Sequence, residues 1–189
     1  MIDVGLKFNG ELRKRTKTTL AVLHHAAAES ATVQQVHQWH LNNGWSGIGY
    51  HIYIDKQGNI FKGRPLDTVG AHSYGYNDIS IGICAEGNFE KEKMAGVQKN
   101  AILSALKEIK KQYPNIEIKG HKDLVATACP GRNYPLNELK ALKGGVTVTT
   151  EQAKTILKEK VGLAQETITF LLCYKYGDEL VQKIAKAVK

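Results

Sequence analysis

The chain has 189 residues, of which 42% are hydrophobic and 23% are charged, enough for one sizeable globular domain and a small appendage. No apolar run approaches the roughly 20 residues that a membrane span needs. Residues 1–17 also lack the apolar core of a secretory signal, so we expect a protein made in the cytoplasm. The net charge of +8 suits a polyanionic partner, but no helix–turn–helix, zinc-finger or RNA-recognition pattern accompanies it, and nucleic acid is not expected.

The first predicted element is a buried strand at residues 20–23, which ends in His24 and His25. Successive side chains of a strand point to opposite faces, so these two imidazoles are expected to do different jobs. Apolar residues then recur at helical spacing through residues 32–43, and Gly44 follows, which predicts a helix that stops there.

The middle of the chain alternates between strand and helix patterns. Residues 50–55 and 59–63 flank the turn KQG and predict a β-hairpin. The remaining predicted elements are a buried strand at 79–87, a helix at 91–112, a short strand at 116–120 and a short helix at 134–142. Cys84 and the residues Trp39, Trp45 and His40 are expected to pack in the core.

The last forty residues differ in character from the rest. Residues 144–149 read as a linker, and residues 150–189 as two or three short helices with natural breaks at Gly162 and Gly177. Cys173 lies in one of their apolar runs and is expected in the core. The pattern predicts a small helical bundle that docks on the rest of the chain, binds a wall polymer, associates with itself, or only stabilises the chain.

Two residues in one loop suggest a metal site. His121 and Cys129 lie eight residues apart after the short strand, and imidazole and thiolate are the ligands that zinc prefers. A third ligand has to come from elsewhere, and the end of the first strand is a reasonable source. The spacing alone also fits a surface histidine and a small buried cysteine.

Four motifs in order carry a family resemblance: LHHAAA, HQWHLNNGWSGIGYHIYIDKQGNIFKGR, VGAHSYGYNDISIGICAEGNF and GHKDLVATACPG. Together they resemble the zinc-dependent N-acetylmuramoyl-L-alanine amidases of type 2, which include phage endolysins and are similar to animal peptidoglycan-recognition proteins. The resemblance covers about residues 18–143. It implies an α/β fold with a mixed, mostly parallel central sheet flanked by helices, so we predict a catalytic domain at residues 1–143 and a small all-helical domain at 150–189.

The resemblance also implies a site. It places His24, His121 and Cys129 as ligands of a Zn²⁺ ion, which activates a water molecule. That water would cleave the amide between N-acetylmuramic acid and the L-alanine of the peptidoglycan stem.

Further site residues follow from the same resemblance. Tyr50 and Thr127 are implied as catalytic, and Thr127 stands where phage relatives carry lysine, which removes a charge. His72 and Asn77 resemble residues that line the substrate groove, and a positional role is equally open for both. Glu86 is an outside candidate for substrate binding.

The function implied is that of a peptidoglycan hydrolase, a phage or prophage endolysin that reaches the wall through a holin-type pore or on lysis. Two alternatives are a peptidoglycan-binding protein without activity and a cytoplasmic amidase that recycles muropeptides. The presence of Cys129 argues against the first, because non-catalytic relatives typically lose this ligand. A homodimer through the C-terminal helices is a further expectation.

Overall fold

The computed structural model describes residues 1–141, 150–173 and 177–187, and the chain separates into two compact units, Met1–Leu142 and Lys143–Lys189. The first unit contains a five-stranded sheet. Its strands are β1 (Leu20–His25), β2 (Ile52–Ile54), β3 (Ile60–Lys62), β4 (Ser80–Ala85) and β5 (Glu117–Gly120), in the order β3-β2-β4-β1-β5. β1 runs parallel to β4 and β5, β2 runs parallel to β4, and only β3 is antiparallel to its neighbour. The predicted mixed, mostly parallel sheet is confirmed.

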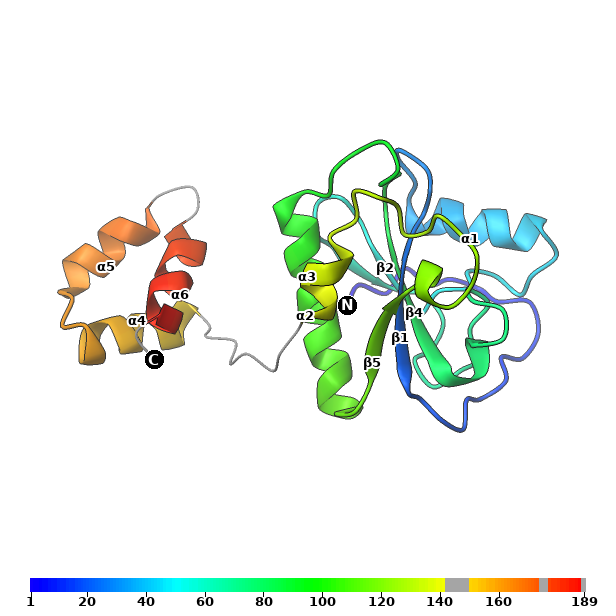
Figure 1. Ribbon diagram of the computed structural model, residues 1–189, viewed down its shortest axis with the longest axis horizontal. Coiled ribbons are helices and arrows are strands. Elements are labelled where there is room, and N and C mark those ends of the chain that lie inside the picture. The colour runs from blue at the N-terminus through cyan, green and yellow to red at the C-terminus, as the bar shows by residue number, and fades with distance from the viewer. Residues whose placement is uncertain (142–149, 174–176, 188–189) are drawn as a thin grey trace. The chain divides into compact units, whose positions relative to one another are not determined.

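Helices cover both faces of this sheet (Figure 1). The helices α2 (Gly96–Gln112) and α3 (Leu136–Lys140) lie on one side, and α1 (Val33–Asn42) lies on the other. The α2 side holds the larger core, in which fully buried Ile102 and Leu106 pack against the apolar side chains of β1 and β4. The smaller core on the α1 side includes Cys84, which is buried as predicted.

The start of α1 is fixed by its own sequence. The Thr32 hydroxyl accepts a hydrogen bond from Gln35 N, and the Gln35 side chain accepts one from Thr32 N. This reciprocal capping box satisfies two backbone donors that the first turn of a helix leaves free. The predicted helix at residues 32–43 is confirmed, and so is the hairpin formed by β2 and β3.

The predicted helix at residues 91–112 is wrong in its first turn, because α2 begins only at Gly96. The preceding residues form a turn in which the Glu92 carboxylate accepts from Asn88 N at 2.8 Å and from Lys56 Nζ at 2.6 Å. These bonds hold the turn against the hairpin and keep it out of the helix. The strand predicted at residues 79–87 is likewise shorter, since a 3₁₀ turn, Asn77–Ile79, precedes β4.

The second unit contains α4 (Thr150–Lys160), α5 (Gln165–Leu172) and α6 (Gly177–Ala187). A small core joins them, with Ala153, Leu157, Ile168, Val181 and Ala185 fully buried. Cys173 is exposed, so its predicted core position is wrong, and Phe170 is 62% exposed. The predicted linker at residues 144–149 lies outside the described residues.

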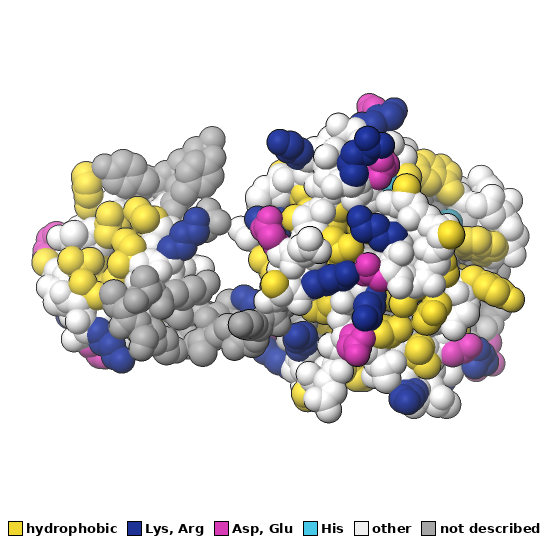
Figure 2. Space-filling model, in the orientation of Figure 1, with side chains coloured by type: hydrophobic (Ala, Val, Ile, Leu, Met, Phe, Trp, Pro, Cys, Tyr) yellow, Lys and Arg dark blue, Asp and Glu magenta, His cyan; other side chains and the backbone are white. Residues whose placement is uncertain are grey.

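Within the described parts of the chain, no helix combines the length and the apolar character needed to cross a membrane. Figure 2 shows Lys and Arg side chains spread over the visible face of the sheet-containing unit, several of them beside Asp or Glu. The ion pairs of this unit include Arg132 with Glu90, at 2.7 Å, and Lys140 with Asp123, at 2.5 Å.

Candidate metal centre

The site forms at the carboxyl end of β1, near the middle of the sheet. His24 lies in register with Cys84 of β4, on the face that α1 covers. His25 points to the opposite face, where its ring stacks on Phe89 and its Nδ1 accepts from Phe89 N at 3.1 Å. Strand alternation therefore separates the two imidazoles as predicted.

The structure brings His24, His121 and Cys129 together, with one possible ligand atom from each lying within 4.8 Å of the others. His121 directly follows β5, the strand next to β1, so two of the three donors come from neighbouring strand ends. The loop then folds back, because Lys122 N donates to Cys129 O at 2.8 Å. This places Cys129 Sγ 3.7 Å from His24 Nδ1.

Burial sets the protonation of these three groups. It lowers the pKa of His24 well below its usual value, with the nearby His121 adding to the effect, and it lowers the pKa of His121. It raises the pKa of the Cys129 thiol to about 11, against an opposing hydrogen bond from the backbone of His25. Two neutral imidazoles thus offer lone pairs, and the thiol can become a thiolate when a cation binds. This donor set could hold a metal ion.

His72 lies against His24 and is 8% exposed, with an edge of it in the lining of the cleft. Its Nδ1 is 3.0 Å from His24 Nε2, and its Nε2 is 3.3 Å from the Ser80 hydroxyl. Burial lowers its pKa well below the usual value. The ring is also enclosed, since a Cβ atom at Gly70 or at Gly82 would lie 2.4 or 2.5 Å from its Cδ2 atom.

Tyr50 packs against His24, with the centroids of the two rings 5.1 Å apart. Burial, with Cys84 and Cys129 nearby, raises the pKa of its phenol well above the usual value. A phenol is already protonated at neutral pH, and this shift keeps it so, which lets Tyr50 donate a hydrogen bond.

Thr127 and Asn77 both line one cleft. Thr127 is exposed, and its hydroxyl accepts from Cys129 N at 3.2 Å, which leaves the hydroxyl proton free to be donated. The Asn77 side-chain oxygen accepts from His72 N and Ser73 N, both at 2.9 Å, and so shapes the loop that carries His72.

Glu86 lies elsewhere. Its carboxylate accepts from Ser30 Oγ, Ala31 N and Lys56 N, and it lines a separate pocket beside the start of α1. A role for Glu86 in substrate binding stays a prediction that these contacts do not support.

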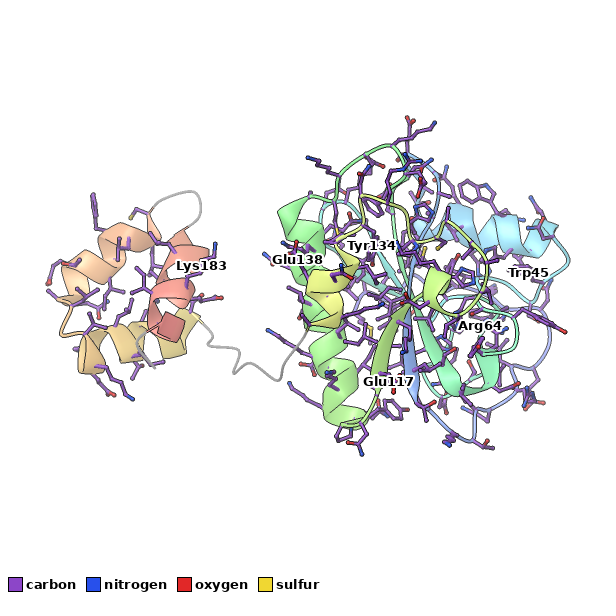
Figure 3. All side chains as sticks on the ribbon, in the orientation of Figure 1. Trp45, Arg64, Glu117, Tyr134, Glu138 and Lys183 are labelled. Carbon is purple, nitrogen blue, oxygen red and sulfur yellow. The ribbon has the colours of Figure 1, made fainter. Side chains whose placement is uncertain are left out.

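The cleft has a volume of about 670 Å³, and its lining includes Tyr50, His72, Asn77, His121 and Thr127. Two aromatic residues line it that sequence reasoning did not place there. Trp45 is 43% exposed and Tyr74 is 92% exposed. Trp39 is 42% exposed, so the predicted core positions of Trp39 and Trp45 are both wrong. Trp45 lies on the α1 side of the sheet in Figure 3, while Glu138 of α3 lies on the other. The sequence did hold one indication that Trp45 is outside the core, because Trp45 follows Gly44 and lies beyond the end of the helix.

The part of the sequence that carries this site matches a known protein family. Residues 14–132, which hold all three possible metal ligands, match the family described as N-acetylmuramoyl-L-alanine amidase. The chain belongs to this amidase family. It is an enzyme that hydrolyses the bond between N-acetylmuramic acid and L-alanine in peptidoglycan.

Its relatives within the family include phage and animal proteins. The chain is 33% identical over 141 residues to the endolysin of Klebsiella phage KP32, covering 68% of this chain and 93% of that protein. It is 30% identical over 132 residues to peptidoglycan-recognition protein SC2 of Drosophila melanogaster, covering 64% of this chain and 71% of that protein. The solved structure of the N-acetylmuramoyl-L-alanine amidase LysC from Clostridium intestinale is similar with a TM-score of 0.71 and 38% identity, covering 74% of this chain and 94% of that one.

Proposed function

We propose that this amidase is a zinc-dependent endolysin of a phage or prophage, with His24, His121 and Cys129 as the metal ligands. The observation that carries the proposal is the convergence of these three donors, within 4.8 Å of one another, beside a cleft. Two imidazoles and one thiolate are ligands that zinc prefers, and three protein ligands with one open position are typical of catalytic zinc sites. The donor set therefore fits zinc.

A bound zinc ion would supply positive charge that polarises the scissile carbonyl and lowers the pKa of water. Side chains of the protein supply the remaining functions of the site. His121 is half-buried and lines the cleft, so the ion that it would hold lies open to the substrate. His24 is buried and would attach the ion to the sheet. Cys129 gives up its proton and carries the negative charge that balances part of the cation's charge.

Two side chains of the cleft are proposed to assist at the reacting carbonyl. The Tyr50 phenol is protonated at neutral pH at its ordinary pKa, and burial raises that pKa further, so it can donate a hydrogen bond to the oxygen on which negative charge develops. The Thr127 hydroxyl can donate a second one, and since it carries no charge we assign it the smaller share. Asn77 holds the cleft wall in shape through the backbone of His72 and Ser73.

The C-terminal unit is proposed to direct the enzyme to intact walls. Its three helices share a small core of their own, and residues 14–132 of the family match do not include it. The whole chain carries a net charge of +8, which favours an anionic wall polymer as its partner, and residues 150–189 contribute +2 of it (seven Lys against five Asp and Glu). Release through a holin-type pore or on lysis completes the proposal, and self-association through these helices stays a prediction.

Two measurements test the proposed function. Mass spectrometry of a peptidoglycan digest should show new amino termini at L-alanine of the stem peptide. Metal analysis of the purified protein should find close to one zinc per chain, and Cys129→Ser should lose both the metal and wall lysis. Lysis by Cys129→Ser in the presence of a chelator would overturn the zinc mechanism.

A further inference from the structure

A chain of hydrogen bonds runs from the metal centre into the sheet. It starts at His24 Nε2, passes through both ring nitrogens of His72 and the hydroxyl of Ser80, and ends at the carbonyl oxygen of Tyr76. The direction of each bond can be worked out from its far end, because a carbonyl oxygen only accepts.

The Ser80 hydroxyl lies 2.6 Å from Tyr76 O and therefore donates its single proton there. Its oxygen can then only accept from His72 Nε2, at 3.3 Å, so the neutral His72 ring carries its proton on Nε2. His72 Nδ1 is left as an acceptor, and the proton in the 3.0 Å contact with His24 must come from His24 Nε2.

The consequence falls on the other nitrogen of His24. A neutral imidazole has one N–H group, so a proton on Nε2 leaves Nδ1 with a free lone pair. This Nδ1 is the atom that lies 3.7 Å from Cys129 Sγ. The opposite tautomer would set two lone pairs, on His24 Nε2 and His72 Nδ1, against each other at 3.0 Å.

The position of His72 is built into the fold. The ring is 8% exposed, and Gly70 and Gly82 leave the space that its Cδ2 edge fills. Asn77 fixes the backbone from which the ring projects, by accepting from His72 N. With these contacts on several sides, His72 can hold the acceptor nitrogen at one place relative to His24.

We propose that His72 is a positioning residue of the metal centre, which accepts the Nε2 proton of His24 and so keeps the Nδ1 lone pair of His24 ready for the metal ion. This inference rests on the proposed function, because it requires that His24 is a metal ligand. It differs from the expectation that His72 contacts the substrate, since both ring nitrogens are engaged within the protein.

Zinc affinity is the first test, measured by competition with a chromophoric chelator. Loss of a partner that orients a metal ligand typically weakens metal binding about 10–100-fold, and we expect this of His72→Ala. His72→Asn should regain most of the affinity, because its side-chain oxygen can accept where Nδ1 did. The matched control is His37→Ala, which deletes another buried imidazole with contacts to Lys7 O and Ile48 N.

The outcomes separate positioning from a merely structural role. Weaker zinc binding by His72→Ala, recovery in His72→Asn and unchanged binding in His37→Ala support the inference. A zinc Kd of His72→Ala equal to that of the wild type, or a loss of affinity in His37→Ala of the same size, overturns it.

A second measurement needs no variant. Two-bond ¹H–¹⁵N NMR correlations of the metal-free wild-type protein report which nitrogen of His24 is protonated. A proton on Nε2 supports the inference, and a proton on Nδ1 overturns it even if His72→Ala does not fold. If the wild type takes up no zinc, the proposed function fails instead, while the NMR result still decides the direction of the hydrogen-bond chain.

Discussion

Removing the Glu86 carboxylate should destabilise the enzyme and leave its chemistry intact. The carboxylate is the partner of two backbone N–H groups, those of Ala31 and Lys56, and of the Ser30 hydroxyl. Ala31 is fully buried, and a buried donor left without a partner costs about 1–3 kcal/mol. Lys56 is partly exposed and contributes less, so Glu86→Ala should lose roughly 2–4 kcal/mol of unfolding free energy.

Thermal unfolding followed by circular dichroism measures this loss. For a unit of this size about 3 °C corresponds to 1 kcal/mol, so the Tm should fall by about 6–12 °C. Glu29→Ala is the matched control, because this carboxylate is exposed and only pairs with exposed Lys91, a kind of contact worth about 0–1 kcal/mol. Hydrolysis of a soluble muropeptide, assayed below both transitions, should stay within about twofold of the wild type. An unchanged Tm together with lost hydrolysis would refute the reasoning and return Glu86 to the substrate.

Three further predictions concern the metal site, acid stability and the C-terminal unit. His24→Ala should abolish zinc uptake, whereas His25→Ala should retain one zinc and lose about 1–3 kcal/mol of stability, because Phe89 N loses its acceptor; equal zinc content in both variants would contradict the division of roles. Burial lowers the pKa of His51 to about 3 and that of His40 to about 4. In the unfolded chain these histidines have their ordinary pKa of about 6.5, so below that pH the unfolded chain binds more protons than the folded one. The free energy of unfolding therefore decreases as the pH is lowered. Urea unfolding at pH 5.5 should show a loss of roughly 1 kcal/mol from each histidine, relative to pH 7.5, and a flat profile would count against this reasoning. Deleting residues 146–189 should spare cleavage of soluble fragments and weaken lysis of whole walls, and equal loss on both substrates would remove the targeting role.

The separation of His24 from His25 was predictable because it depends only on the two-residue period of a strand. The neighbouring placement of His121 follows from a short parallel strand, β5, beside β1. The return of Cys129 to the same point is different. It depends on the fold of a nine-residue loop, which the spacing of His121 and Cys129 does not determine. The expectation that Cys129 lies beside His24 came from the family resemblance.

Other features could not be predicted from local patterns. The partners of Glu86 come from residues 30, 31 and 56, and nothing near Glu86 in the sequence indicates them. The first turn predicted for α2 was lost to Glu92, whose carboxylate bonds Lys56 across a gap of 36 residues. Tryptophan is an apolar residue type that is expected in a core, and the exposure of Trp45 is explained only by its place in the lining of the cleft.

The three proposed metal ligands are not held with equal rigidity. His24 belongs to β1, which is hydrogen-bonded on both edges and buried along its whole length. His121 and Cys129 belong to a loop whose backbone bonds are few, so this segment should open far more readily than the strand. The loop should then set the residence time of a bound ion, because two of the proposed ligands would leave together while His24 stays in place. Amide hydrogen exchange across residues 121–129 should follow the rate of zinc dissociation, and exchange in β1 should be independent of it.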